Sequence, residues 1–160
     1  MTSVTLRAWL LCIVCMSAAA GATAAENSLY VRLGVEAGVA AISNMLIDRV
    51  AADPVMGPSF KDSKLSRIKT LLAEQICDLS GGPCHYSGDP MKEVHAGHHI
   101  TEAMFYRMVD TLRGILKERH VDLRSTNQLL RLLAPMKRDV VEHGSAPAAA
   151  PAAPPASGAP

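Results

Sequence analysis

The histidines are the residues of this sequence whose spacing most clearly suggests chemistry. His85 lies in a stretch rich in glycine and proline, and His95, His98 and His99 follow within five residues of one another. If that segment is helical, spacings of three and four residues place His98 and His99 near His95, where three imidazoles can chelate a divalent metal. Cys84 and His85 can add to this cluster. In the alternative interpretation, His98 and His99 are solvated residues at the end of a short helix.

His95 differs from the other histidines because its neighbours are apolar. Val94 and Ala96 flank it, and Met91 precedes it by four residues, on a predicted helix that follows a strong helix stop. A single histidine on an apolar face is often a satisfied core residue, but a neutral imidazole is also a common metal ligand. Spacing alone leaves both interpretations of His95 open.

Several other classes of function are disfavoured. The sequence contains no phosphate-binding glycine loop, no zinc-protease helix and no serine nucleophile elbow. Residues 26–143 hold all 15 carboxylates and all but one of the 16 lysines and arginines, so their formal charge is zero, and they contain few aromatic residues. Both properties argue against a nucleic acid partner. No apolar run approaches the roughly 20 residues of a membrane-spanning helix.

The two ends of the chain differ in composition from the rest. Residues 1–25 contain one charge, Arg7, followed by an apolar stretch over 8–20 and by small residues through Ala25. This order predicts a signal peptide cleaved after Ala24 or Ala25, and hence an exported protein, periplasmic or secreted, without stable membrane insertion after cleavage. An uncleaved apolar helix is the alternative. Residues 144–160 contain only Ala, Pro, Ser and Gly, which predicts a disordered tail.

Two cysteines, Cys77 and Cys84, lie outside the predicted signal peptide and are seven residues apart. In an exported protein a disulfide between them can form and persist. Alternatively, Cys77 is a small buried residue on a helix and Cys84 a turn residue, with Cα atoms too far apart for a bond. The sequence favours neither interpretation.

Apolar residues recur at helical spacing through residues 26–143, and no stretch alternates as a strand would. The first long helix is expected over about 36–52, ended by Asp53-Pro54, because proline disfavours helical geometry in the residue before it. Asp62 or Ser63 can cap the next helix, which ends at the glycines and proline of 81–83.

The second half of the domain is also expected to be helical. A short helix begins near Met91 and extends past His95, and Thr101 caps a longer one. The last helix runs from about Ser125 to Glu142, with a bend at Pro135, which removes one backbone donor. These elements predict a single all-α domain over 26–143. Its shortage of aromatic bulk is compatible with a bound prosthetic group.

A series of short motifs occurs along this domain in a fixed order. They are Ser28-Leu29-Tyr30 with Leu33-Gly34, Ala52-Asp53-Pro54, Phe60, Gly81-Gly82-Pro83, Tyr86 with Gly88, Met91-Lys92, His95-Ala96-Gly97, Ile100-Thr101, Phe105 and Leu133-Ala134-Pro135-Met136. In order and spacing the series resembles the truncated hemoglobins, in particular group 1, from about Ser28 to His143. The resemblance implies a two-over-two helical sandwich around heme b, iron protoporphyrin IX.

The resemblance also implies roles for individual residues. His95 resembles the proximal histidine that binds the heme iron, and Phe60 resembles a phenylalanine that packs against the porphyrin. Lys69 is expected to reach a heme propionate, and His98 either contacts a propionate or lies in water. The other residues expected to line the heme are Leu65, Ile68, Leu72, Ile76, Met91, Val94, Ile100, Phe105, Val109 and Met136.

The sequence departs from the group 1 pattern on the distal side, where the gas binds. Group 1 members usually place a tyrosine and a glutamine there, whereas alignment places Leu46 and Leu72, with Ile68 also apolar. The missing hydrogen bond is worth about 1.5–3 kcal/mol, so dioxygen release is expected to be roughly ten- to a hundredfold faster than with tyrosine present. Val35 replaces a glycine, and His98-His99 replace a Leu-Gly-like pair, which affects the loop after His95.

Three hypotheses for the function follow. The first is a heme protein that reversibly binds dioxygen, nitric oxide or carbon monoxide at iron held by His95. The second is a heme enzyme for nitric oxide dioxygenation or peroxide reduction, with an unidentified reductase as partner. For this second hypothesis, the sequence shows no distal acid, base or hydrogen-bond donor. The third is a heme-free metal-binding protein that uses His85, His95, His98 and His99.

Overall fold

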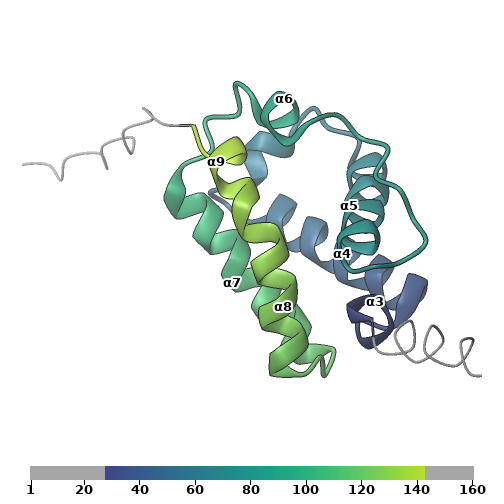
Figure 1. Ribbon diagram of the computed structural model, residues 1–160. Coiled ribbons are helices and arrows are strands. Elements are labelled where there is room, and N and C mark those ends of the chain that lie inside the picture. Colours follow the sequence, from purple (N-terminus) through teal and green to yellow (C-terminus); the bar gives the residue numbers. More distant parts are fainter. Residues whose placement is uncertain (1–27, 143–160) are drawn as a thin grey trace, which may run out of the picture.

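The structure, a computed structural model, describes residues 28–142 and consists of helices joined by turns (Figure 1). No strand occurs within these residues, so the all-α prediction is confirmed. The elements are α3 (Leu29–Arg32), α4 (Val35–Ala52), η1 (Gly57–Phe60), α5 (Leu65–Leu79), α6 (Met91–His95), α7 (Glu102–Glu118), α8 (Leu123–Leu133), η2 (Ala134–Met136) and α9 (Lys137–Val140). In this part of the chain no helix has the length and apolar character needed to cross a membrane. The predicted signal peptide and tail lie outside the described residues.

The junction of α3 and α4 requires two glycines, Gly34 and Gly38. Gly34 has a left-handed backbone (φ 91°), and the chain passes so close to α4 that a Cβ atom on Gly38 would lie 2.0 Å from the Leu33 carbonyl oxygen. Val35, which replaces a glycine of the group 1 pattern, also has a positive φ of 50°. A β-branched residue is strained in this region, so the valine is tolerated at a conformational cost.

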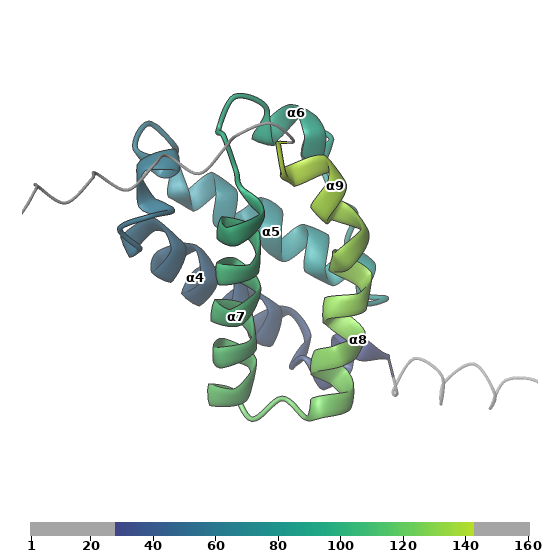
Figure 2. The same ribbon diagram turned by 90° about the vertical axis from the view of Figure 1, so that its left-hand side faces the viewer.

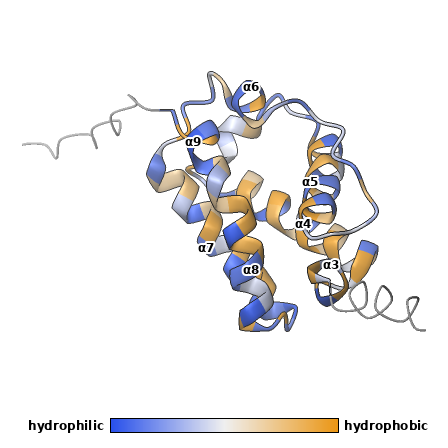
Figure 3. Cartoon of the chain, in the orientation of Figure 1, coloured by the Kyte–Doolittle hydropathy of each residue, from blue (hydrophilic) through white to orange (hydrophobic). Residues whose placement is uncertain are grey.

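The longer helices form two pairs. Helix α4 packs against α5, and α7 packs against α8, while α4 also contacts α7 across the core. Figure 2 shows α7 and α8 side by side, joined by a short turn at one end. Long stretches of α4 are coloured as hydrophobic in Figure 3, in keeping with its central place. The buried core consists of Leu29, Leu33, Val39, Ile42, Leu46, Val50, Met56, Ile76, Cys77, Leu112, Ile115, Leu116 and Leu129.

Two predicted helix starts are wrong. Helix α5 begins after Lys64, which provides no side-chain cap, and not after Asp62 or Ser63. The Ser63 amide donates to the Phe60 carbonyl, so this segment completes the η1 turn before α5 begins. Helix α8 begins at Leu123, because the Asp122 side chain accepts a hydrogen bond from the Ser125 amide and caps it.

Other boundaries agree with the sequence. Helix α4 ends at Ala52, directly before Asp53-Pro54, and α7 begins after Thr101, whose hydroxyl accepts the Met104 amide at 3.2 Å. The predicted bend at Pro135 is a short 3-10 segment, η2, which separates α8 from α9. The predicted end of α5 at the 81–83 turn is also confirmed, since α5 ends at Leu79 and Gly81 is left-handed (φ 83°).

The prediction that the short helix extends past His95 is wrong, because α6 ends at His95. Ala96 is extended, and Gly97 and His99 have positive φ values of 79° and 53°. Two left-handed residues within three positions are incompatible with a continuing α-helix. His98 and His99 therefore lie on a loop, and helical spacing does not apply to them.

Cys77 and Cys84 form a disulfide, with Cα atoms 5.7 Å apart. Of the two interpretations left open, the alternative in which the Cα atoms are too distant is thus wrong. The bridge joins the last turn of α5 to the long connection that leads to α6. Gly82 lies inside this closed loop, where a Cβ atom would approach the Cys77 sulfur to 2.5 Å and the Tyr30 ring to 2.8 Å.

Candidate functional site

His95 is the last residue of α6 and is half-buried. Its Nδ1 atom lies 2.8 Å from the Met91 carbonyl oxygen, so Nδ1 is the protonated nitrogen that donates this bond. Burial lowers the pKa of His95 below its usual value, and the nearby His98 adds to this effect, although the bond to Met91 opposes it. Within residues 28–142 Nε2 has no hydrogen-bond partner. The result is a neutral, oriented imidazole with a free Nε2 lone pair, which is the form that binds a metal.

The other histidines do not join His95 in a chelating cluster. In the part of the chain that the structure describes, no group of three or more His, Cys, Asp or Glu side chains is arranged to hold a metal ion. The predicted trio of His95, His98 and His99 is therefore wrong, because α6 ends before the last two. His85 is exposed, 3.8 Å from Asp78, and Cys84 is in the disulfide.

The residues predicted to line a heme come from the elements around His95. Phe60 ends η1; Leu65, Ile68, Lys69, Leu72 and Ile76 lie on α5; Met91 and Val94 lie on α6; His98 and Ile100 follow α6; Phe105 and Val109 lie on α7; and Met136 ends η2. Ile68 and Leu72 are one helical turn apart on α5, and both are half-buried. Most of the other apolar members are half-buried as well.

A few of these residues differ from that pattern. Ile76 and Phe105 are buried, with 0% and 7% exposed, and Leu46, the predicted distal residue on α4, belongs to the main core cluster at 4%. Val94 is 37% exposed, and His98 is exposed. The half-buried majority is the informative group, because packing within the chain leaves these large apolar side chains only partly covered.

Lys69 lies on α5 as predicted, but its ammonium group pairs with Asp48 of α4 at 2.5 Å. Its side chain is 24% exposed. A contact between Lys69 and a heme propionate remains a prediction. It requires Lys69 either to leave Asp48 or to bind Asp48 and the propionate together.

Gln75 is a buried polar residue that the sequence analysis missed. It is 8% exposed, and its Nε2 atom lies 3.5 Å from the sulfurs of both Met91 and Met136. The amide thus links α5 to α6 and η2 beside His95. A signal was present in the sequence, because Gln75 follows Leu72 by three residues and so occupies a position on an otherwise apolar helical face.

Ile47, the neighbour of Leu46 on α4, is a further candidate for the distal side that the sequence interpretation did not name. It is buried, with 7% exposed, but it lies outside the main core cluster to which its neighbour Leu46 belongs. Leu46 and Ile47 both have hydrocarbon side chains. Neither would therefore supply a hydrogen-bond donor to a gas bound on the distal side.

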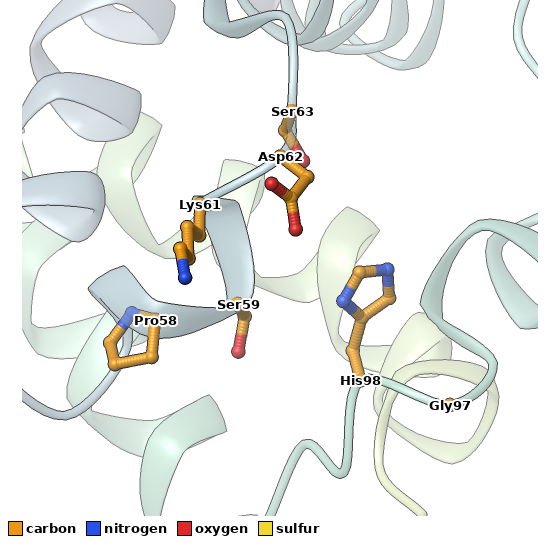
Figure 4. Close-up of a pocket in the computed structure, with 7 residues that line it drawn as sticks. All are labelled: Pro58, Ser59, Lys61, Asp62, Ser63, Gly97 and His98. Carbon is orange, nitrogen blue, oxygen red and sulfur yellow. The ribbon is translucent and has the colours of Figure 1, made fainter.

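A polar pocket of about 490 Å³ opens beside the turn that follows His95. It is lined by Pro58, Ser59, Lys61, Asp62, Ser63, Gly97 and His98. Figure 4 shows side chains from the η1–α5 turn and the ring of His98 around a common space. Its lining suits water and charged groups, in contrast to the apolar residues of α5.

Comparison with known proteins agrees with this arrangement. The family model described as Bacterial-like globin matches residues 28–142. The group 1 truncated hemoglobin GlbN of Mycolicibacterium paratuberculosis is 28% identical over 113 residues, covering 71% of this chain and 83% of that protein. The group 1 truncated hemoglobin of Tetrahymena pyriformis is 25% identical and is covered to 95%.

Solved structures give the same result for the fold. The crystal structure of the truncated hemoglobin from Tetrahymena pyriformis in the Fe(III) form superposes with a TM-score of 0.69 at 25% identity, covering 73% of this chain and 100% of that one. The two-over-two arrangement of α4, α5, α7 and α8 is thereby confirmed as that of a truncated hemoglobin. This chain belongs to the bacterial-like globin family, the members of which hold heme and bind diatomic gases.

Proposed function

We propose that this chain is an exported globin that binds heme b through His95 and reversibly binds dioxygen, with nitric oxide and carbon monoxide as further ligands. The observation that carries the proposal is the state of His95. Its Nδ1 is bonded to the Met91 carbonyl, burial lowers its pKa, and Nε2 is free within the described residues. His95 would hold the heme through Nε2, and the heme iron would supply the binding of a diatomic gas.

The apolar residues around His95 fit such a group. Leu65, Ile68, Leu72, Met91 and Val109 are half-buried, so a flat apolar ligand placed against them removes further hydrocarbon surface from water. The members on α5, Leu65, Ile68 and Leu72, have a second role: they exclude water from the gas-binding side, which slows oxidation of a ferrous iron.

Reversible gas binding is favoured over catalysis by the distal residues. Leu46, Ile68 and Leu72 carry no proton donor, acid or base, and the missed Ile47 adds none. Gln75, the buried amide of α5, directs its donor to the sulfurs of Met91 and Met136. Proton transfer to a bound peroxide needs a positioned acid or base, whereas reversible binding needs only access.

Export is supported by the Cys77–Cys84 disulfide, because such bonds persist in oxidising compartments and are rare in the cytosol. The mass of the protein recovered from the periplasm or medium tests this part of the proposal. A mass matching cleavage after Ala24 or Ala25 is expected, and an intact N-terminus in the cytoplasmic fraction contradicts export.

The absorption spectrum of the mature protein, recovered from its native compartment, tests the central claim. We expect a Soret band that is lost in His95→Gly and returns when imidazole is added, because free imidazole can take the place of the deleted ring. His120→Gly is the matched control, since His120 is exposed beyond the end of α7 and its loss should leave the band in place. A colourless wild-type protein that binds zinc through His98 and His99 overturns the proposal.

A further inference from the structure

The loop after His95 has little of its own to hold it in place. Ala96, Gly97, His98 and His99 are all exposed, and two of them have positive φ values. No atom lies within 4 Å of the position that a Cβ on Gly97 would take. Segments with few buried contacts open locally at low free energy, so this loop requires contacts from elsewhere to keep one conformation.

Glu142, two residues beyond the end of α9, supplies such contacts. Its Oε1 accepts the Gly97 amide at 2.6 Å, and its Oε2 lies 3.2 Å from Nδ1 of His99. Its own amide donates to the Ile100 carbonyl at 3.0 Å. Glu142 alone, at the end of the domain, thus contacts three of the five residues that follow His95. We call this set of contacts the Glu142 clamp.

The surroundings of Glu142 agree with a charged acceptor. Burial raises the pKa of its carboxyl, but hydrogen bonds from Gly97 and His99, together with the charge of His99, more than offset this effect and leave the pKa below its usual value. In addition, α9 packs against α6, so the clamp extends an existing contact between these helices.

We propose that Glu142 is a positioning residue for His95: by fixing the turn directly after the iron ligand, it holds the end of α6 and the orientation of the imidazole. The Met91 bond sets the rotation of the ring, whereas the clamp sets the path of the backbone that carries it. The effect on iron rests on the proposed function, but the effect on the loop does not.

Hydrogen exchange of the purified full-length mature chain tests the loop directly. In Glu142→Ala the Gly97 amide is expected to exchange at least tenfold faster than in the wild type. Asp139→Asn is the matched control, because Asp139 is an acidic residue of α9 that pairs with its neighbour Arg138 at 3.7 Å. Its Gly97 exchange should be unchanged. Equal exchange in Glu142→Ala and wild type overturns the clamp, whether or not the protein binds heme.

Two measurements on the heme-loaded protein test the consequence for iron. Transfer of hemin to a scavenging apoprotein is expected to be several-fold faster in Glu142→Ala, and the iron–histidine stretching band should shift or broaden. Glu142→Gln, which keeps one oxygen acceptor, should fall between the two and serves as the working variant if alanine prevents folding. If Glu142→Ala speeds Gly97 exchange but leaves the iron–histidine band unaltered, the positioning role is overturned. If no variant contains heme, the result contradicts the proposed function instead.

Discussion

The two sides of the candidate heme site are built by different means. On the distal side, α4 and α5 are regular helices that present hydrocarbons such as Ile68 and Leu72, held by packing. On the proximal side, residues 80–100 contain only the five residues of α6 as helix. The rest of this connection is held by individual bonds: the Cys77–Cys84 disulfide, the Ser87 contacts with Glu74, and the Glu142 clamp.

This difference separates two requirements of a gas-binding site. In the proposed function the gas must enter and leave, and an apolar wall without hydrogen-bond donors is expected to keep the release rate high. The iron ligand must stay in one place, and a short irregular segment can do this only if it is fixed at several points. On the proximal side, deleting a single bond is therefore expected to lower stability or to displace the iron ligand. On the distal side, the rate of gas release is expected to depend on whether a side chain can donate a hydrogen bond.

The largest expected effect comes from removing the disulfide. Cys77→Ala with Cys84→Ala should lower the free energy of unfolding by about 2.5 kcal/mol, because a bridge across a short loop restricts the unfolded chain. Urea unfolding of the mature protein measures this. The wild type in reducing agent is the control and should show a similar loss. A loss below about 0.5 kcal/mol would show that the proximal connection does not depend on its covalent link.

The next effect tests the distal side. Leu72→Gln should slow dioxygen dissociation roughly ten- to a hundredfold, since a hydrogen bond to the partly charged ligand is worth about 1.5–3 kcal/mol. Stopped-flow displacement by carbon monoxide measures the rate. Leu123→Gln is the control, because Leu123 is 74% exposed at the start of α8. An unchanged rate in Leu72→Gln would place the gas away from this part of α5.

A smaller effect is expected from the packing of the proximal connection. Gly82→Ala should destabilise the protein by about 1.5 kcal/mol, because its Cβ would overlap the Cys77 sulfur and the Tyr30 ring. Gly114→Ala on α7 is the matched control. It meets no atom within 4 Å and should stabilise the helix by about 0.5–1 kcal/mol. Thermal unfolding of both variants compares them, and equal melting temperatures would contradict the crowding at Gly82.

The smallest effect concerns the ion pair between the distal helices. Lys69→Met should change the free energy of unfolding by no more than about 0.5 kcal/mol, because ion pairs near the surface contribute little. Urea unfolding checks this value, and a larger loss would show that the distal pair also depends on single bonds. Hemin transfer from the same variant adds a separate result: faster loss would show that Lys69 leaves Asp48 for a propionate.

The helical parts of the fold were predictable from local patterns. The end of α4 at Ala52 follows from Asp53-Pro54, and the start of α7 follows from Thr101. Both depend on residues adjacent in the sequence. The start of α8 is two residues earlier than the sequence pattern predicts, because the pattern indicates Ser125 as its beginning. In the structure Ser125 is buried and bonded to Asp122, the actual cap, and accepts a hydrogen bond from Arg32 of α3.

The irregular parts were not predictable in the same way. Gly97 and Glu142 are 45 residues apart, and no local pattern shows that they meet. The sequence does not decide the disulfide, because its formation depends on how the chain turns at residues 80–83, which brings the Cα atoms to 5.7 Å from each other. The role of His95 as the iron ligand remains a prediction that rests on its resemblance to a proximal histidine, and the bond from Nδ1 to the Met91 carbonyl is consistent with it.

The Glu142 clamp has a practical consequence for where the domain can be cut. The last helix ends at Val140, so a truncation designed from secondary structure alone would stop there or at Val141. Such a truncation removes the carboxylate and the amide that contact Gly97 and Ile100. Expression fragments and fusion junctions should therefore keep the chain intact through at least residue 142, since the boundary of the functional unit is set by a side-chain contact and not by the end of a helix.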